Sequence, residues 1–354
     1  MASPADFAAR TLNRGGRRLH VHTAGETGPL VLLCHGFPEN WYCWRHQMTA
    51  LAAAGYRAVA MDMIGYGRSA KPADPAAYRM TEQIGDCLAV VEALGEARAV
   101  IVGHDLGSAL AWSAAWTRPD VFRAVVGMSL PFGGRGLAAL PGDPFGDQPP
   151  HFVQAAIAGP GRMFYHEYFT LPGGVAAREA ERDVRSWLAA VFYSMSADRP
   201  LPPELEGLDL TKLPPEFQLE FVRAAMTMPR EGNIDAIIAL PEAMPAWLTP
   251  EVLDHAVAEL EYSGLSGPLS HYANGQINWE ALGAYQDKPV SVPALYIGGD
   301  RDIVTIWARE AIDRAPERVP DLRGSVIAPN CGHWIQQEQP EVVNAALLSF
   351  LAGL

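Results

Sequence analysis

The stretch VGHDLGS at residues 102–108 constrains the fold more than any other part of the chain. It follows a short apolar run at residues 99–102 and precedes ALAWSAAW, whose composition is typical of a helix. Gly103 and Gly107, on either side of the central Asp105, allow a tight turn that larger side chains would obstruct. The pattern predicts a buried strand, a sharp turn that points Asp105 into a cleft, and a helix.

Asp105 stands where many hydrolases place a serine, at the centre of the Gly-x-Ser-x-Gly nucleophile elbow. An aspartate here could also be a plain helix N-cap. A carboxylate at a helix N-terminus stays ionised because the helix dipole favours negative charge there. It is then a nucleophile at neutral pH without a base to activate it. Serine esterase chemistry is disfavoured, because Ser108 lies beyond the elbow.

Strand-like and helix-like segments alternate in the first third of the chain and again near its end. The strands are expected at residues 18–23, 30–34, 57–61, 99–102, 124–128, 292–298 and 324–328, and the helices at 83–94, 306–314 and 341–351. Alternation of this kind predicts an α/β fold with a mostly parallel sheet and helices on both of its faces.

The pattern changes between residues 133 and 286, where strand-like runs are lacking and over half of the 29 prolines fall. Frequent prolines divide a segment into short helices. We therefore expect a core domain made of residues 1–132 and 287–354, with a helical lid inserted at 133–286. Reactive groups gather at the carboxyl ends of strands in such sheets, so a lid at that edge would cover the site.

The composition favours a cytoplasmic enzyme over a nucleic-acid or membrane protein. The formal net charge is −13, from 27 basic and 40 acidic residues, which disfavours nucleic acid and anionic membranes as partners. The N-terminus lacks the apolar run of a signal peptide, and no stretch reaches the ~18 apolar residues of a membrane span. The four cysteines have neither metal-site spacing nor the number that a disulfide framework requires.

Two motifs near the C-terminus supply the partners that an elbow nucleophile needs. GGDRDIV, with Asp300 and Asp302, ends one expected strand, and NCGHW, with His333, follows the last one. Triads on this fold run nucleophile, acid, histidine in chain order. Either aspartate could hold the histidine ring through its N–H, and spacing alone does not choose between them.

The motif HGFPE at residues 35–39 follows the strand expected at 30–34. In a fold with an elbow, this loop offers one backbone N–H to an oxyanion, and the residue after the nucleophile offers a second. The two donors would be Phe37 and Leu106. Each donor of this kind typically contributes ~10²–10³ in rate.

Four motifs in this order resemble the epoxide hydrolases of the α/β-hydrolase fold: HGFPENWYCWRHQ, AMDMIGYGRS, GHDLGS and GHW. The resemblance extends along nearly the whole chain. It implies an enzyme that converts a small-molecule epoxide to a vicinal diol without a cofactor or a metal. It also implies that Asp105 is the nucleophile, His333 the base and Asp302 the orienting acid. The expectation of a homodimer rests on this resemblance alone.

The resemblance places two lid tyrosines where they would hold the epoxide oxygen. These are Tyr165 in FYHEYF and Tyr272 in SHYAN, with Tyr168 as the competitor for the first position. A tyrosine with an ordinary pKa near 10 is protonated at neutral pH and can donate to a developing alkoxide. We further expect the walls of the substrate pocket to be His35, Pro38, Trp41 and Trp334.

Leu106 departs from the family pattern, in which a tryptophan commonly follows the nucleophile. The closest alternative activity is that of a haloalkane or haloacid dehalogenase, which uses the same elbow, aspartate and histidine. A departing halide needs N–H or cationic donors, and the side chains of Leu106 and Phe37 offer none. A non-catalytic receptor on this fold is a further alternative, disfavoured because every triad member is present.

Overall fold

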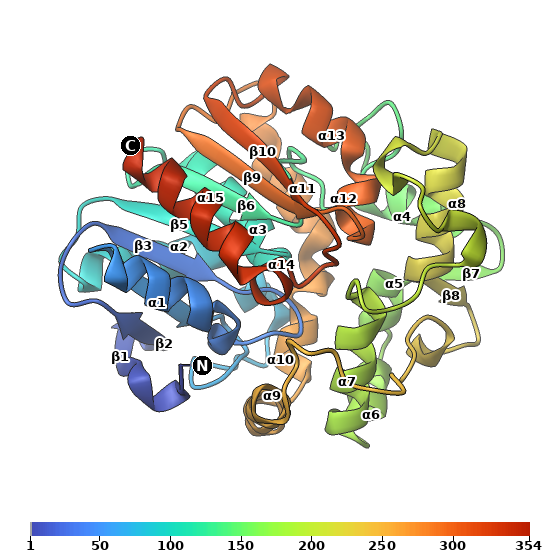
Figure 1. Cartoon of the computed structure of the whole chain (residues 1–354), viewed down its shortest axis with the longest axis horizontal. Helices are drawn as coiled ribbons and strands as arrows, with labels where there is room; N and C mark the ends of the chain where they lie inside the picture. Colours follow the sequence, from blue (N-terminus) through green and yellow to red (C-terminus); the bar gives the residue numbers. More distant parts are fainter. Residues whose placement is uncertain (1) are drawn as a thin grey trace.

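An eight-stranded sheet forms the centre of the computed structural model, which describes residues 2–354 (Figure 1). The order across the sheet is β1-β2-β4-β3-β5-β6-β9-β10. Its strands are β1 (Ala8–Arg14), β2 (Arg17–Ala24), β3 (Leu30–Cys34), β4 (Arg57–Asp62), β5 (Ala99–His104), β6 (Phe122–Met128), β9 (Ala294–Gly299) and β10 (Leu322–Ala328). The β1–β2 and β2–β4 pairs are antiparallel, whereas the other neighbours run parallel. The mostly parallel α/β sheet is confirmed.

Helices cover both faces of the sheet. Figure 1 shows α1 (Arg45–Ala53) and α15 (Pro340–Ala352) on the near face, with α2 (Met80–Ala93) and α3 (Leu106–Thr117) on the far face. This double cover explains why every residue of β3 and β5 is buried and why these strands have continuous apolar sequences. The edge strand β1 is mostly exposed, and its polar sequence gave no strand signal.

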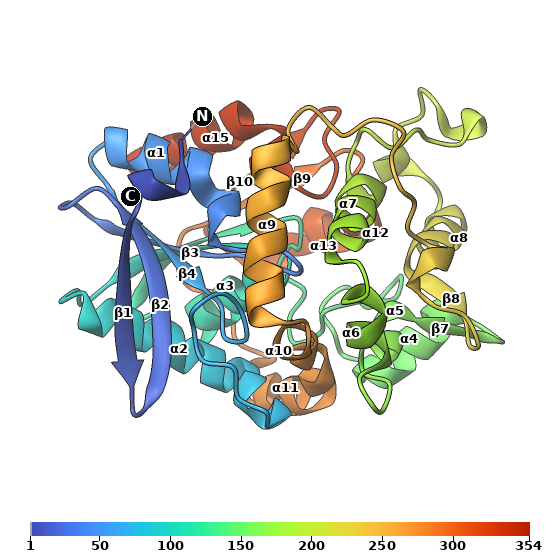
Figure 2. The ribbon, with the colours of Figure 1, turned by 90° about the horizontal axis from the view of Figure 1, so that it is seen from below.

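Between β6 and β9 the chain forms a set of helices that lies beside the sheet. They are α4 (Pro150–Ala158), α5 (Tyr165–Phe169), α6 (Val175–Ala180), α7 (Val184–Met195), α8 (Pro215–Met226), α9 (Pro250–Ser263), α10 (Ser266–Ser270) and α11 (Gly275–Leu282). In Figures 1 and 2, α4–α8 gather at the end of the molecule away from β1 and β2.

Two expectations about individual elements are wrong. The inserted segment does contain strands, because β7 (Arg162–Phe164) and β8 (Thr227–Pro229) form an antiparallel pair. Three residues are too few to produce a readable alternation of apolar and polar positions. The single helix expected at 306–314 is divided into α12 (Ile303–Trp307) and α13 (Arg309–Arg314).

The sheet brings the sequence motifs to one edge. β5, β6 and β9 are neighbouring parallel strands, and β10 pairs with β9, so their carboxyl ends meet at the same edge. The helix α14 (Ile335–Glu338) follows the loop after β10. Along residues 2–354, no helix has the length and apolar character needed to cross a membrane.

Close backbone contact between β5 and α3 sets the position of the elbow. A Cβ atom at Gly103 would lie 1.9 Å from the carbonyl oxygen of Gly107. A Cβ atom at Gly107 would lie 2.1 Å from the carbonyl oxygen of Cys34 in β3. Backbone atoms cannot move aside as a flexible side chain can, so these two positions require glycine.

We predict that Gly103→Ala lowers the free energy of unfolding by about 2–3 kcal/mol or more, because the new methyl group overlaps backbone. The matched control is Gly275→Ala at the start of α11, where the nearest heavy atom is 3.8 Å from the added Cβ. That control should be neutral or slightly stabilising. Urea unfolding of both variants provides the comparison, and equal midpoints would contradict the close contact.

Candidate active site

Asp105 occupies the turn between β5 and α3 in a conformation that is costly for any residue except glycine. Its φ is 53° and its ψ is −122°, and its side chain does not cap α3. The residue is 8% exposed. The backbone N–H of Phe37 donates to Oδ1 of Asp105 over 3.0 Å. The strained backbone therefore aims the carboxylate towards the HGFPE loop.

His333 approaches the other carboxylate oxygen. Its Nε2 lies 3.7 Å from Oδ2 of Asp105, and its Nδ1 lies 3.0 Å from Oδ1 of Asp302. Asp300 has a different partner, because its Oδ1 accepts a hydrogen bond from the backbone N–H of Cys331. The geometry thus distinguishes the two aspartates that spacing could not: Asp302 meets the imidazole, and Asp300 fastens the loop that carries it.

Ser129 is a member of this cluster that the sequence analysis missed. It follows the end of β6 with a φ of 66°, and it is fully buried. Its Oγ donates to Oδ2 of Asp302 over 2.6 Å and lies 3.0 Å from Nδ1 of His333. No motif marks a hydroxyl at this place, but its position after a central parallel strand is a signal that could have found it.

The charges around His333 determine its protonation. Burial lowers the pKa of His333, but Asp302, Asp105 and Glu39 raise it, and the net result is a pKa of about 9. Burial raises the pKa of Asp302, whereas His333 and Ser129 lower it, and the net shift is downward. At neutral pH the ring is therefore an imidazolium between two carboxylates.

A second buried pair lies behind His333. His104 contacts the backbone carbonyl of His333 through Nε2 and Glu39 through Nδ1, each over 2.7 Å. Both nitrogens of the His104 ring are therefore in hydrogen-bond contact. Gln336 and Gln337 also donate to Glu39. The sequence analysis did not single out His104 or Glu39, although each belongs to a motif that it quoted.

Two tyrosines of the inserted segment face the carboxylate. Tyr165 begins α5, and Tyr272 begins a short 3₁₀ helix after α10; their ring centroids are 5.9 Å apart. Neither hydroxyl makes a hydrogen bond within residues 2–354. Burial and the charge of Asp105 raise the pKa of Tyr165, and burial, Tyr165 and Asp105 raise that of Tyr272. The hydroxyl of Tyr168 instead donates to Glu179, so this competitor has its own partner.

A cavity of about 70 Å³ separates the tyrosines from Asp105. Its wall is otherwise mostly apolar. The lining residues are Phe37, Pro38, Asp105, Tyr165, Phe169, Val191, Met195, Met226, Ile234, Ile237, Ile238, Tyr272 and His333. Of the four residues expected in the pocket wall, Pro38 lines this cavity.

Three other residues expected in the pocket wall do not line this cavity. His35 accepts a hydrogen bond from the backbone N–H of Met63. The Trp41 ring stacks on His22 with centroids 3.6 Å apart. Trp334 is fully buried and donates its Nε1–H to a backbone carbonyl of α7. These residues are adjacent to site residues in sequence, but adjacency does not fix the direction of a side chain.

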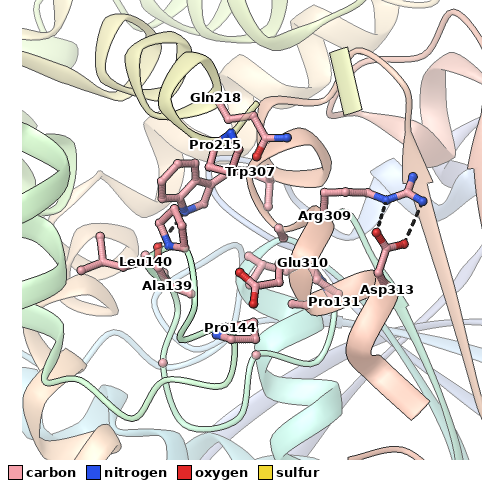
Figure 3. Close-up of a pocket in the computed structure, with 18 of the residues that line it drawn as sticks. Pro131, Ala139, Leu140, Pro144, Pro215, Gln218, Trp307, Arg309, Glu310 and Asp313 are labelled. Atoms are coloured by element: carbon pink, nitrogen blue, oxygen red, sulfur yellow. Dashed lines mark hydrogen bonds and ion pairs between the residues drawn. The ribbon is translucent and has the colours of Figure 1, made fainter. Parts of the chain in front are cut away.

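A larger cavity of about 400 Å³ lies between the loop after β6, the start of α8, and α12–α13 (Figure 3). Pro131, Leu140 and Trp307 are among its lining residues, and none of Asp105, Asp302, His333, Tyr165 and Tyr272 is. Figure 3 shows the Arg309–Asp313 ion pair at its edge. The smaller cavity is therefore the candidate active site, because it alone of the two combines a carboxylate, an imidazole and two phenols.

Comparison with known proteins shows the family of this chain. A family model described as alpha/beta hydrolase fold matches residues 29–167. Epoxide hydrolase B of Mycobacterium tuberculosis is 44% identical over 98% of both chains, and epoxide hydrolase A of the same organism is 37% identical over 100% of this chain and 99% of its own. The structure of an epoxide hydrolase from an endophytic Streptomyces has a TM-score of 0.86 and 43% identity, and the alignment covers 98% of this chain and 96% of that one. Because the similarity spans nearly the full length of these proteins, the chain belongs to the epoxide hydrolases of the α/β-hydrolase fold.

Proposed function

We propose that this chain hydrolyses epoxides to vicinal diols through a hydroxyalkyl ester on Asp105. The observation that carries the proposal is the position of this carboxylate, which faces the phenols of Tyr165 and Tyr272 across one small cavity and has His333 beside it. An epoxide carbon is saturated, so its opening needs in-line attack by a group that is already anionic. Asp105 meets that need, whereas a neutral serine would not.

The two carboxylate oxygens of Asp105 have different surroundings and therefore different roles. Oδ2 attacks a ring carbon, so a new C–O bond forms as the C–O bond of the epoxide breaks. Oδ1, held by the Phe37 N–H, becomes the carbonyl oxygen of the ester. When water later adds to the ester, the N–H groups of Phe37 and Leu106 stabilise the negative charge on that oxygen.

The tyrosines supply the proton that ring opening requires. The leaving oxygen would be a strongly basic alkoxide, and a poor leaving group without a donor. Tyr165 and Tyr272 stay protonated at neutral pH because burial raises the pKa of both. Two rigidly held phenols can therefore donate to one oxygen, which takes the proton as the ring opens.

His333 acts in the second step. The free ring is protonated, with a pKa of about 9, and one cause of this raised value is the charge of Asp105. Formation of the ester neutralises Asp105, so the pKa of the ring falls and its proton can replace the one that a tyrosine gave up. Neutral His333, oriented by Asp302, then takes a proton from water, and the resulting hydroxide attacks the ester carbonyl. The tetrahedral intermediate breaks its C–O bond to the diol, whose oxygen takes the proton of the added hydroxyl group, so Asp105 returns as a carboxylate and His333 as an imidazolium.

The cavity wall supports an epoxide with an uncharged, apolar substituent. Ile234, Ile237 and Ile238 line it together with Met195 and Met226. A charged substituent would lose its hydration there without gaining a partner. Leu106 and Phe37 carry no side-chain donor for a halide, so no observation favours dehalogenation.

We predict that His333→Gln opens the epoxide but does not hydrolyse the ester. The ester should accumulate with styrene oxide, and the intact protein mass should rise by that of one epoxide. Peptide mapping should place the addition on Asp105. The double variant His333→Gln/Asp105→Ala is the matched control and should show no addition. An adduct that persists in the double variant, or maps to another residue, would contradict the covalent mechanism.

We further predict that Tyr165→Phe and Tyr272→Phe each lower the single-turnover rate of ring opening by about 10²-fold, because each removes a proton donor. Tyr168→Phe is the matched control, since its hydroxyl bonds Glu179, and its rate should stay within a few-fold of wild type. If all three variants opened the epoxide at the same rate, the tyrosines would have no role in proton donation.

A further inference from the structure

The antiparallel strands β2 and β4 carry three potential metal ligands on one face, away from Asp105. His20 and His22 are two residues apart in β2, so their side chains share a face of the sheet. Asp62 pairs with His20 across the β2–β4 ladder and lies on that face too. One ligand atom from each side chain lies within 4.8 Å of the other two, and all three residues are buried. In the sheet, β3 lies between this cluster and β5.

Two polar atoms of this cluster have no hydrogen-bond partner within residues 2–354. They are Nε2 of His22 and Oδ1 of Asp62, which lie 3.8 Å apart. The side chain of His22 is 9% exposed and that of Asp62 is 0% exposed. Buried polar atoms are rarely left unpaired, so this pair needs an explanation. A cation that accepts a lone pair from each atom would provide one.

The surrounding hydrogen bonds leave one ligand atom free on each side chain. The hydroxyl of Thr11 bonds Nδ1 of His20, which leaves Nε2 of that ring for a metal. The backbone N–H of Arg68 donates to Oδ2 of Asp62, which leaves Oδ1. Nε2 of His22 has no hydrogen-bond partner within residues 2–354, so it is the third ligand atom.

A neighbouring positive charge, on Arg68, is already compensated. The guanidinium of Arg68 is held by both carboxylate oxygens of Glu259, over 2.7 and 2.9 Å. Oδ1 of Asp62 has no hydrogen-bond partner within the described residues, and a divalent cation would supply one.

We propose that His20, His22 and Asp62 bind one Zn²⁺ ion, with water as the fourth ligand. Two imidazoles and a carboxylate are ligands that Zn²⁺ favours, whereas Mg²⁺ and Ca²⁺ prefer oxygen ligands throughout. Tetrahedral Zn²⁺ ligands lie about 3.4 Å apart, so the side chains close inward on binding. The two unpaired atoms break no hydrogen bond when they move. The ion would fasten β2 to β4, far from the diol-forming reaction.

The test is Zn²⁺ titration of the full-length protein after chelator treatment, with calorimetry and a competing chromophoric chelator. One equivalent should bind and raise Tm. His20→Gln and His22→Gln should each weaken binding by at least about tenfold. His151→Gln is the matched control, because that exposed histidine bonds Gln276, outside the cluster, and its replacement should leave binding unchanged.

A second variant separates metal binding from folding. Thr11→Val keeps all three ligands but removes the hydroxyl that orients His20, so affinity should fall by about tenfold while the Tm of the metal-free protein changes little. Circular dichroism of each metal-free variant checks the fold. Failure to bind Zn²⁺, or binding that is the same in wild type, His20→Gln and His22→Gln, would overturn the proposal.

Discussion

The confined carboxylate of Asp105 is the constraint on which the rest of the site depends. A buried charge is costly unless it is paired and hydrogen-bonded. Here the Phe37 N–H and the His333 ring supply partners, and the N-terminus of α3 adds a favourable field. The strained turn that holds the carboxylate is stabilised in turn by glycine contacts between β5 and α3.

Residues near the ends of the strands hold His333, which is the partner of this carboxylate, at both its ring and its main chain. Asp302 and Ser129, from the ends of β9 and β6, hold the ring of His333. His104, which is held in turn by Glu39, bonds the backbone carbonyl of His333. Because the ring and the main chain of His333 are both fixed, its Nε2 remains directed at Asp105 without a hydrogen bond of its own to that carboxylate.

The sequence predicted those elements whose backbone geometry or burial requires particular residue types. The Gly-x-Asp-x-Gly turn predicted the elbow because few other structures need glycines at those two places. Continuous apolar runs predicted the central strands, which the helices cover on both sides. The polar edge strand β1 and the three-residue strands β7 and β8 gave no readable period, so they were not found.

It was harder to predict which residues form the site, because this depends on the direction of each side chain. Spacing could not separate Asp300 from Asp302, which differ in the groups they face. Trp41 lies four residues after Phe37, yet its ring stacks on His22 instead of lining the cavity. Ser129 belongs to no motif, and its position directly after β6 was the one sequence signal for it.

The central claim, nucleophilic attack by Asp105, is tested most directly by a single turnover in water enriched in ¹⁸O, with enzyme in excess over epoxide. In the proposed mechanism the new diol oxygen comes from the carboxylate. The first-turnover diol should therefore be unlabelled, and the peptide that contains Asp105 should gain one ¹⁸O. Full label in the first-turnover diol, with none in that peptide, would show direct attack by water and contradict the account.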